Sequence, residues 1–340
     1  MKKIKIGIIC PSEIAYRRFM PALIQLSDKY EFVGVAIADE KEWNGIIDNK
    51  TKQNEIKKAN QFIKDYGGQL FKSYSSLITS NQVEAIYLPL PPALHFQWAQ
   101  YALNNNKHVF LEKPSTTHLK DTQKLIELSK LKKLVIHENY MFQYHKQIDI
   151  IKKLIRNKEI GEIRLIRSNF GYPKRSKNDF RYNKELGGGS LLDCGGYPIK
   201  LMTLILGKNI QVDSSKLFYN EQDIDLYGSA QLSSKNQVAQ ISFGMDNSYK
   251  CDIEIWGSLG TITSSRIFTA PNGFETDILI STNNKQECIH VDGDDSFRKS
   301  LAKFYDCIIN TKQREKEYCE ILLQSKLVEL IKEKSKYESN

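Results

Sequence analysis

A lysine that follows a predicted buried strand and immediately precedes a proline has the clearest chemical potential in this sequence. The segment is Val109-Phe-Leu-Glu112, followed by Lys113 and Pro114. In open α/β sheets, ligands bind beyond the carboxyl ends of the strands, so an amine at this end would face the crevice where chemistry takes place. We therefore interpret Lys113 as a candidate catalytic amine. The segment alone also allows an ordinary solvated lysine, because the chain has 49 Lys and Arg residues.

Three consecutive glycines, 187–189, precede a helical pattern that carries Asp193 and Tyr197. Residues four apart share one face of a helix, so this carboxylate and this phenol could address the same ligand. An accidental helical pair has the same spacing and is the alternative. Gly195 and Gly196 would each cost about 1 kcal/mol relative to alanine in an ordinary surface helix, so the sequence predicts close packing at this point.

The turn after the first predicted strand lies where a dinucleotide fold binds pyrophosphate at a helix N-terminus. Gly7 and the small Ala15 are all that remains of the usual glycine pattern. Ser12 could supply hydrogen bonds in place of a glycine, and Ile14 belongs to the same turn. Glu13 would have to point away from the phosphates, because like charges repel. The lost glycines leave the affinity for a cofactor open.

Other predicted strand ends supply further candidates. Asp39 follows the second strand, where a carboxylate would bind the ribose hydroxyls and favour NAD over NADP; an exposed loop acid explains it equally well. Leu88 and Pro89 lead into a proline-stiffened turn and a helix that presents His95. That histidine could line the cofactor, or it could be a capping or core-edge residue. Asn139 ends another strand, and a buried amide there must find partners.

The elements that would position these residues form two patterns along the chain. From residue 3 to about 140, short β-branched runs alternate with amphipathic helical patterns, which is typical of βαβ units and a doubly wound parallel sheet. After Gly161, longer strands follow one another with few helices, which predicts a large, mostly antiparallel, open-faced sheet. We therefore expect an α/β protein with a dinucleotide-binding domain over residues 1–140 and a substrate-binding α+β domain over residues 141–340.

Composition argues against several classes of function. The 340 residues carry a formal charge of +9, but acids are interleaved with the basic residues, so we expect no nucleic-acid partner. The excess charge would favour anionic small molecules such as phosphate-bearing cofactors or sugar nucleotides. No apolar run approaches the roughly 20 residues of a membrane span and no signal-peptide cleavage site is visible, which predicts a cytoplasmic protein without a membrane partner. The six scattered cysteines predict neither disulfides nor a metal site.

The order and spacing of these motifs resemble the Gfo/Idh/MocA family of NAD(P)-dependent oxidoreductases over nearly the whole chain. The resemblance is carried by Ala15 with Pro21-Ala-Leu23, Leu88-Pro-Leu-Pro91 with His95, Glu112-Lys-Pro114, Glu138-Asn139, and Gly187-Gly-Gly189 with Asp193 and Tyr197. It implies an N-terminal Rossmann domain and a catalytic Lys113. It also implies a C-terminal domain whose open sheet packs against another subunit, in a homodimer or homotetramer.

Two features place the chain within that family. Tyr197 stands where many members have histidine, and in this it resembles the branch with the sugar 3-ketoreductases of deoxysugar biosynthesis, which act on nucleotide-linked keto hexoses. Ile37 and Ala38 stand where the NADP-using ketoreductases have Ser-Arg, so NAD and NADP both remain open as cofactors. Basic residues in the segment 172–184 could meet a diphosphate, although surface charge explains Lys174 more simply.

The sequence and the resemblance together predict three sets of site residues, and no metal. The catalytic set is Lys113 and Tyr197. The substrate set is Asp193, Asn139, Phe142 and His145, with buried packing as the alternative for Phe142. The cofactor set is Gly7, Ser12, Glu13, Ile14, Asp39, Leu88, Pro89, His95, Glu112, Lys113, Asn139 and Arg181.

The expected activity is hydride transfer between NAD or NADP and a carbonyl or hydroxyl of a sugar, most simply the reduction of a nucleotide-linked keto-deoxyhexose. The alkoxide that develops needs a proton. We expect Tyr197 to donate it while Lys113 orients the carbonyl and stabilises the phenolate, although the two roles could be exchanged. Asp193 would hold the sugar hydroxyls or the lysine. The alternatives are the same chemistry in the oxidative direction, and a non-catalytic sugar-sensing protein with this fold.

Overall fold

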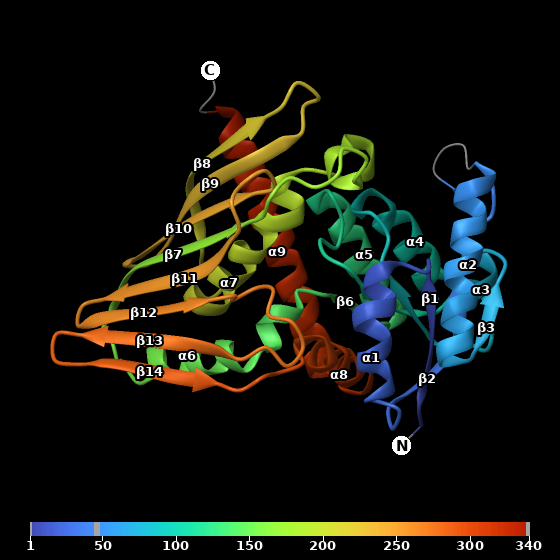
Figure 1. Ribbon diagram of the computed structural model, residues 1–340, viewed down its shortest axis with the longest axis horizontal. Helices are drawn as coiled ribbons and strands as arrows, with labels where there is room; N and C mark the ends of the chain where they lie inside the picture. Colours follow the sequence, from blue (N-terminus) through green and yellow to red (C-terminus); the bar gives the residue numbers. More distant parts are fainter. Residues whose placement is uncertain (1, 44–47, 338–340) are drawn as a thin grey trace. The chain divides into compact units, whose positions relative to one another are not determined.

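The computed structural model describes residues 2–43 and 48–337, and its first sheet is parallel throughout (Figure 1). The strand order is β3-β2-β1-β4-β5-β6. The strands are β1 (Ile4–Ile9), β2 (Tyr30–Ala36), β3 (Gln69–Phe71), β4 (Ala85–Leu88), β5 (His108–Leu111) and β6 (Ile136–Glu138). The order reverses direction between β1 and β4, which is the switch point where such sheets bind ligands. The predicted doubly wound parallel sheet is confirmed.

Helices connect these strands, and local sequence explains where several of them begin. They are α1 (Met20–Ile24) after a π-helical turn (Ala15–Phe19), α2 (Asn49–Tyr66), α3 (Tyr74–Thr79), α4 (Pro92–Asn104) and α5 (Leu119–Lys132). Asp48 caps α2 by accepting a hydrogen bond from Thr51 N at 2.6 Å. Ser73 and Ser76 form a reciprocal capping box at α3. Pro92 opens α4, where its missing N–H costs nothing.

The second sheet has eight strands in the order β14-β13-β12-β11-β7-β10-β9-β8. They are β7 (Ile163–Gly171), β8 (Gln211–Tyr219), β9 (Asp225–Ser234), β10 (Gln237–Gly244), β11 (Lys250–Gly257), β12 (Gly260–Ser265), β13 (Thr276–Thr282) and β14 (Gln286–Val291). The β7–β10 pair is parallel and the other pairs are antiparallel. The predicted mostly antiparallel sheet is confirmed.

One face of this sheet is packed and the other is open. Apolar side chains of the strands form a core with α6 (Lys146–Arg156), α7 (Gly196–Leu206) and the later part of α9 (Thr311–Tyr337). On the opposite face Arg167 lies between Gln240 and Glu254, at 3.2 Å and 3.4 Å from their side-chain oxygens. Trp256 and Leu279 also point to this face, and each is 52% exposed. An open sheet face with exposed apolar side chains is a candidate interaction surface.

The chain folds into two compact units, each of which we describe by itself. Unit 1 comprises residues 1–139 and 300–322, and unit 2 comprises residues 140–299 and 323–340. Residues 300–322, which we expect in the second domain from the sequence, cluster with unit 1. The reason is packing that the sequence does not reveal: from α8 (Ser296–Ile309), Phe304 lies 5.4 Å from the ring of Phe110 and Tyr305 lies 5.8 Å from that of Tyr30. The binding roles expected of the two domains stay predictions.

Within residues 2–43 and 48–337, no helix combines the length and the apolar character needed to cross a bilayer.

Candidate functional site

The turn after β1 keeps its shape although the usual glycines are missing. Cys10 has a φ of 75°, the left-handed conformation that glycine normally supplies. Ser12 N donates to Cys10 O at 2.8 Å, and Ser12 Oγ accepts from Ala15 N at 3.2 Å. The hydroxyl of Ser12 therefore accepts from one N–H group at the start of the π-helical turn. Gly7 has a different reason to be small, because a Cβ there would lie 3.0 Å from the side chain of Leu77 in α3.

This turn fits a pyrophosphate. Glu13 points outward with a side chain that is 84% exposed and 3.8 Å from Arg17, so its charge is directed away from the turn. Among the described residues, the N–H groups of Glu13 and Ile14 have no acceptor. Free N–H groups in the first turn of a helix are the usual donors to phosphate. Contact of these residues with a cofactor stays a prediction.

The carboxylate of Asp39 is held in a fixed position just beyond β2. Its Oδ1 accepts from Lys41 N at 2.8 Å and from Glu42 N at 3.0 Å. The carboxylate of Glu42 in turn accepts from Asp39 N at 3.2 Å and from Tyr74 N and Ser75 N at 2.7 Å and 2.8 Å. Glu42, which sequence reasoning missed, thus ties this loop to the start of α3.

The turn that carries Lys113 is anchored on both sides. Before it, Glu112 N donates to Leu88 O at 3.2 Å; after it, Ser115 N donates to Glu138 Oε1 at 2.7 Å. His95 is fully buried and its Nδ1 lies 2.8 Å from Pro114 O. Because these bonds fix the backbone around it, Lys113 occupies a defined place at the carboxyl end of β5.

His95 links two strand ends. Its Nε2 lies 2.7 Å from Leu90 O, in the turn that follows the buried Leu88 and Pro89. Burial lowers the pKa of His95 to about 4, although the two carbonyl oxygens oppose this shift. The ring is therefore neutral at physiological pH, and its single N–H donates to one of the two oxygens. The contacts recorded for His95 are therefore those of a core-edge histidine, the alternative that the sequence left open.

The carboxylate of Glu112 collects polar groups from neighbouring strands. Its Oε1 accepts from Tyr87 Oη and from Asn139 Nδ2, each at 2.8 Å. Burial raises the pKa of Glu112, while these two hydrogen bonds and the charge of Lys113 oppose the shift. Asn139 is 3% exposed and its Oδ1 accepts from Ser300 Oγ at 2.8 Å. The buried amide has found the partners that its burial requires.

In unit 2, Tyr197 stands in a cluster of aromatic rings. Its centroid lies 5.0 Å from Phe170, 5.3 Å from Tyr140 and 5.9 Å from Phe142. Phe142 is 2% exposed, so its contacts within the unit are those of a core residue. His145 is 1% exposed and caps α6 by accepting from Gln147 N at 3.3 Å.

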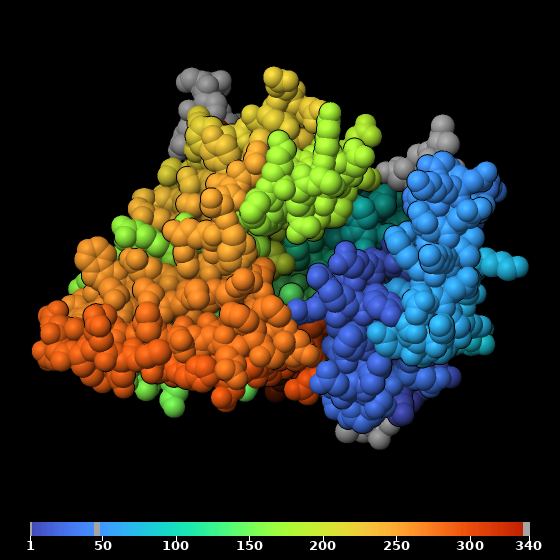
Figure 2. Space-filling view, in the orientation of Figure 1, coloured from blue at the N-terminus to red at the C-terminus, as the bar shows by residue number. Residues whose placement is uncertain are grey.

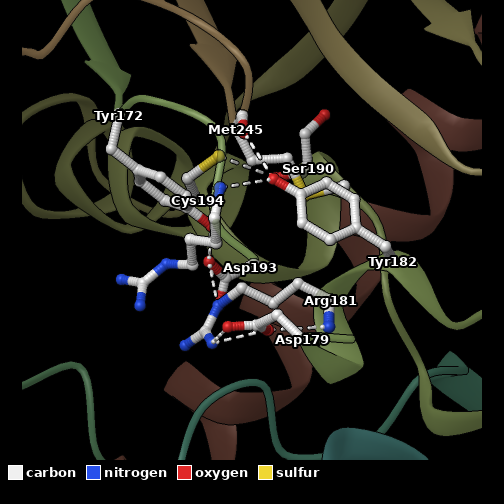
Figure 3. A network of polar contacts seen from close by, with 9 residues as sticks. Tyr172, Asp179, Arg181, Tyr182, Ser190, Asp193, Cys194 and Met245 are labelled. Carbon is white, nitrogen blue, oxygen red and sulfur yellow. Dashed lines mark hydrogen bonds and ion pairs between the residues drawn. The ribbon is translucent and has the colours of Figure 1, made fainter. Parts of the chain in front are cut away.

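The carboxylate of Asp193 organises the segment that follows β7 (Figure 3). Tyr172 Oη donates to Asp193, and Arg181 Nε lies 2.9 Å from Asp193 Oδ2. Burial alone would lower the pKa of Arg181, but the carboxylate of Asp193 outweighs it and raises that pKa. The same guanidinium lies 3.1 Å from Asp179. Asp193 therefore fixes Arg181 and, through it, the fold of this segment.

This segment is otherwise exposed. Figure 2 shows residues 173–187, in yellow-green, at the surface with projecting side chains. Tyr182 secures it, because its hydroxyl accepts from Arg175 N and donates to Met245 O, both at 3.0 Å (Figure 3). Arg175 lies 5.0 Å from the ring of Tyr172.

The structure brings the predicted residues together in two groups. Unit 1 holds the candidates at the ends of its parallel strands, and unit 2 holds Asp193, Tyr197 and Arg181. Sequence reasoning missed the hydrogen-bonding partners Tyr87, Tyr172 and Ser300. His137, which contacts Ser300, was missed as well. A titratable residue inside the apolar strand β6 could have drawn attention to His137, whereas nothing in the local sequence distinguishes Ser300. Within the part of the chain that the structure describes, no cluster of three or more His, Cys, Asp or Glu could hold a metal.

Comparisons with known proteins cover almost the whole chain. Residues 4–140 match a family described as "Oxidoreductase family, NAD-binding Rossmann fold", and residues 148–263 match "GFO/IDH/MocA C-terminal domain". The dTDP-3,4-didehydro-2,6-dideoxy-alpha-D-glucose 3-reductase of Saccharopolyspora spinosa is 33% identical over 89% of this chain and 87% of that protein. The protein of the same name from Actinomadura kijaniata is 30% identical over 97% of this chain and 95% of its own length.

Solved structures give the same picture. A 3-ketoreductase from Actinomadura kijaniata in complex with NADP and TDP-benzene has a TM-score of 0.88 and 30% identity over 98% of each chain. An aldose-aldose oxidoreductase from Caulobacter crescentus has a TM-score of 0.85 over 99% of this chain and 98% of its own, but at 16% identity it shares the fold alone.

Proposed function

Because the chain belongs to the Gfo/Idh/MocA family of oxidoreductases, we propose that it reduces a keto group of a dTDP-linked deoxyhexose. The similarity to 3-reductases over 97% of the chain is the observation that carries this proposal. The family resemblance expected from the motifs is confirmed, and the chain is an NAD(P)-dependent oxidoreductase. The turn formed by Cys10 and Ser12 supports cofactor binding and removes the reason for considering a non-catalytic protein.

The nicotinamide cofactor, when bound, supplies the hydride. In the turn that contains Gly7, Ser12, Glu13 and Ile14, the free N–H groups of Glu13 and Ile14 and the hydroxyl of Ser12 would hold its pyrophosphate end. Asp39 would bind the adenosine ribose from its fixed place beyond β2. This chain has to add the proton that the new alkoxide requires.

Tyr197 and Lys113 are the proposed proton-transfer pair. A tyrosine with its reference pKa of about 10 is a neutral phenol at physiological pH, so Tyr197, held among the aromatic rings, can donate when charge develops on the sugar oxygen. An ammonium at Lys113 would then stabilise the phenolate that remains, or donate the proton itself. Asn139 would position the sugar ring, and Asp193 would fix the segment 172–184 through Arg181.

The test is turnover of dTDP-3,4-didehydro-2,6-dideoxy-D-glucose with NADH and NADPH, followed by cofactor absorbance. Lys113→Ala and Tyr197→Phe should each lower kcat roughly a hundredfold or more. Lys120→Ala and Tyr101→Phe, which lie on exposed positions of α5 and α4, are the matched controls. Undiminished turnover by both site variants would exclude these roles. If the enzyme oxidises the product alcohol faster than it reduces the keto sugar at every cofactor ratio tested, the alternative function, a sugar dehydrogenase, is favoured.

We also propose that the open face of the second sheet joins two or more copies of the chain. Trp256 and Leu279 expose apolar surface on it, and Arg167 and Glu254 offer charges for pairing. Light scattering should detect a dimer or tetramer that Leu279→Glu dissociates. Leu131→Glu, at an 81% exposed leucine of α5, is the control. A monomeric wild-type protein would contradict the proposal.

The free cysteines support a cytoplasmic location, where thiols stay reduced.

A further inference from the structure

A continuous chain of buried polar groups in unit 1 runs from α9 to the residue beside Lys113. Glu317 Oε1 lies 2.8 Å from His137 Nδ1, and His137 Nε2 lies 2.9 Å from Ser300 Oγ. Ser300 Oγ donates to Asn139 Oδ1 at 2.8 Å, and Asn139 Nδ2 donates to Glu112 Oε1 at 2.8 Å. His137 and Ser300 are 0% exposed, and Glu317 and Asn139 are 3% exposed. None of the proposed catalytic steps uses His137, Ser300 or Glu317.

Counting donors along this chain fixes the position of its protons. The carboxylate of Glu112 accepts from Tyr87 and from the amide of Asn139, so Asn139 Oδ1 is left to accept from Ser300. Ser300 has one hydroxyl proton and has donated it to Asn139. Its oxygen must then accept from His137, which requires a proton on Nε2.

The other end of the histidine then needs a proton as well. At 2.8 Å, His137 Nδ1 and Glu317 Oε1 are within ion-pair distance, and two unprotonated, electron-rich atoms would repel each other at this separation. A proton therefore belongs to the pair as a whole, which leaves the pair neutral, as burial requires. Phe110 stacks on the imidazole at 5.1 Å and Phe304 lies 6.1 Å from it, so apolar rings shield the pair.

One reversed arrangement satisfies the same atoms. In it, a protonated Glu112 donates to Asn139 Oδ1, the flipped amide donates to Ser300, and Ser300 donates to an unprotonated His137 Nε2. Burial raises the pKa of Glu112 and works towards this arrangement, whereas the charge of Lys113 and the hydrogen bond from Tyr87 stabilise the carboxylate and work against it. The tautomer of His137 and the ionisation of Glu112 are thus coupled through two side chains.

We infer that the His137–Glu317 pair is a positioning element of the catalytic site. By keeping a proton on Nε2, it orients Ser300 and the amide of Asn139 so that Glu112 remains an accepting carboxylate beside Lys113. The role in catalysis rests on the proposed function, whereas the proton positions do not.

Two measurements separate these parts. With 15N-labelled histidine, NMR of the full-length protein should find a protonated Nε2 on the ring that disappears in His137→Gln. A neutral ring protonated at Nδ1 alone would overturn the inference. This result does not depend on turnover, so it decides the chain of hydrogen bonds even if no nucleotide sugar is reduced and the proposed function fails.

Kinetics tests positioning. Ser300→Ala breaks the chain and should lower kcat/KM at least tenfold, whereas Ser129→Ala removes another fully buried serine hydroxyl of unit 1 and should leave it unchanged. His137→Phe should lower kcat/KM as much as Ser300→Ala does. His137→Gln, whose amide can donate to Ser300, should retain most of the wild-type kcat/KM. Phe304→Leu perturbs the packing around His137 without removing a hydrogen bond. Equal losses in Phe304→Leu and His137→Phe, at equal Tm, would show a merely structural role and overturn the inference.

Discussion

Replacing Gly196 with alanine is a sharp test of how Tyr197 is held. A Cβ at Gly196 would lie 2.0 Å from Tyr140 Oη and 2.9 Å from Tyr140 Cζ, and real Cβ atoms essentially never approach a heavy atom closer than 3.0 Å. Either the helix or the ring must move by about 1 Å. Neither can move freely, because Tyr140 is fully buried and stands edge-on to Tyr197 at 5.3 Å. The main chain of Gly196 is also held, since its carbonyl accepts from Gln324 Nε2 at 2.8 Å.

The expected magnitude follows from two opposing effects. Alanine is the better helix former by about 1 kcal/mol, whereas overpacking a rigid core costs about 1–3 kcal/mol or more. An overlap as large as this one belongs at the upper end, so Gly196→Ala should lower the free energy of unfolding by about 2 kcal/mol. Because Tyr197 is the next residue, kcat should fall as well.

Urea unfolding of Gly196→Ala, Tyr140→Phe and the double variant measures the clash directly. Removing the hydroxyl of Tyr140 relieves the closest contact, so the double variant should be more stable than the sum of the single effects predicts, by about 1 kcal/mol. Strict additivity, or a Gly196→Ala protein within about 0.5 kcal/mol of the wild type, would refute the packing argument.

Two further predictions concern unit 1. If the carboxylate of Asp39 faces the cofactor ribose, Asp39→Asn should shift the ratio of NADPH to NADH Kd values about tenfold towards NADPH; fluorescence titration measures it, and an equal shift in Glu40→Gln of the same exposed loop would contradict it. Between pH 6.5 and about 4, His95 is neutral in the folded state and protonated when unfolded, so the unfolded state binds more protons and stability falls as the pH drops. The loss should reach about 3 kcal/mol in urea unfolding, and a slope unchanged in His95→Gln would refute the assignment.

The sequence by itself determined the architecture and the position of the candidate catalytic lysine. Alternating apolar runs and helical periods encode βαβ units, because strand and helix impose different spacings on buried side chains. The position of Lys113 at a strand end follows from the same reasoning, and so does the expected closeness of packing at Gly196, where a Cβ would collide with Tyr140. The residue types and spacings behind these expectations lie close together along the chain, although the partner of Gly196, Tyr140, lies 56 positions away and only the fold identifies it.

Tertiary structure decided which side chains act on one another. Ser300 donates a hydrogen bond to Asn139, which lies 161 positions away in the sequence. The carboxylate of Asp193 accepts from Tyr172 and pairs with Arg181. Cys10 adopts a glycine-like conformation that its residue type disfavours. Hydrogen bonds between distant residues and strained turns depend on how whole elements pack, and packing leaves no local signature in the sequence. The sequence therefore identified the lysine, and the fold supplied the buried chain of partners beside it.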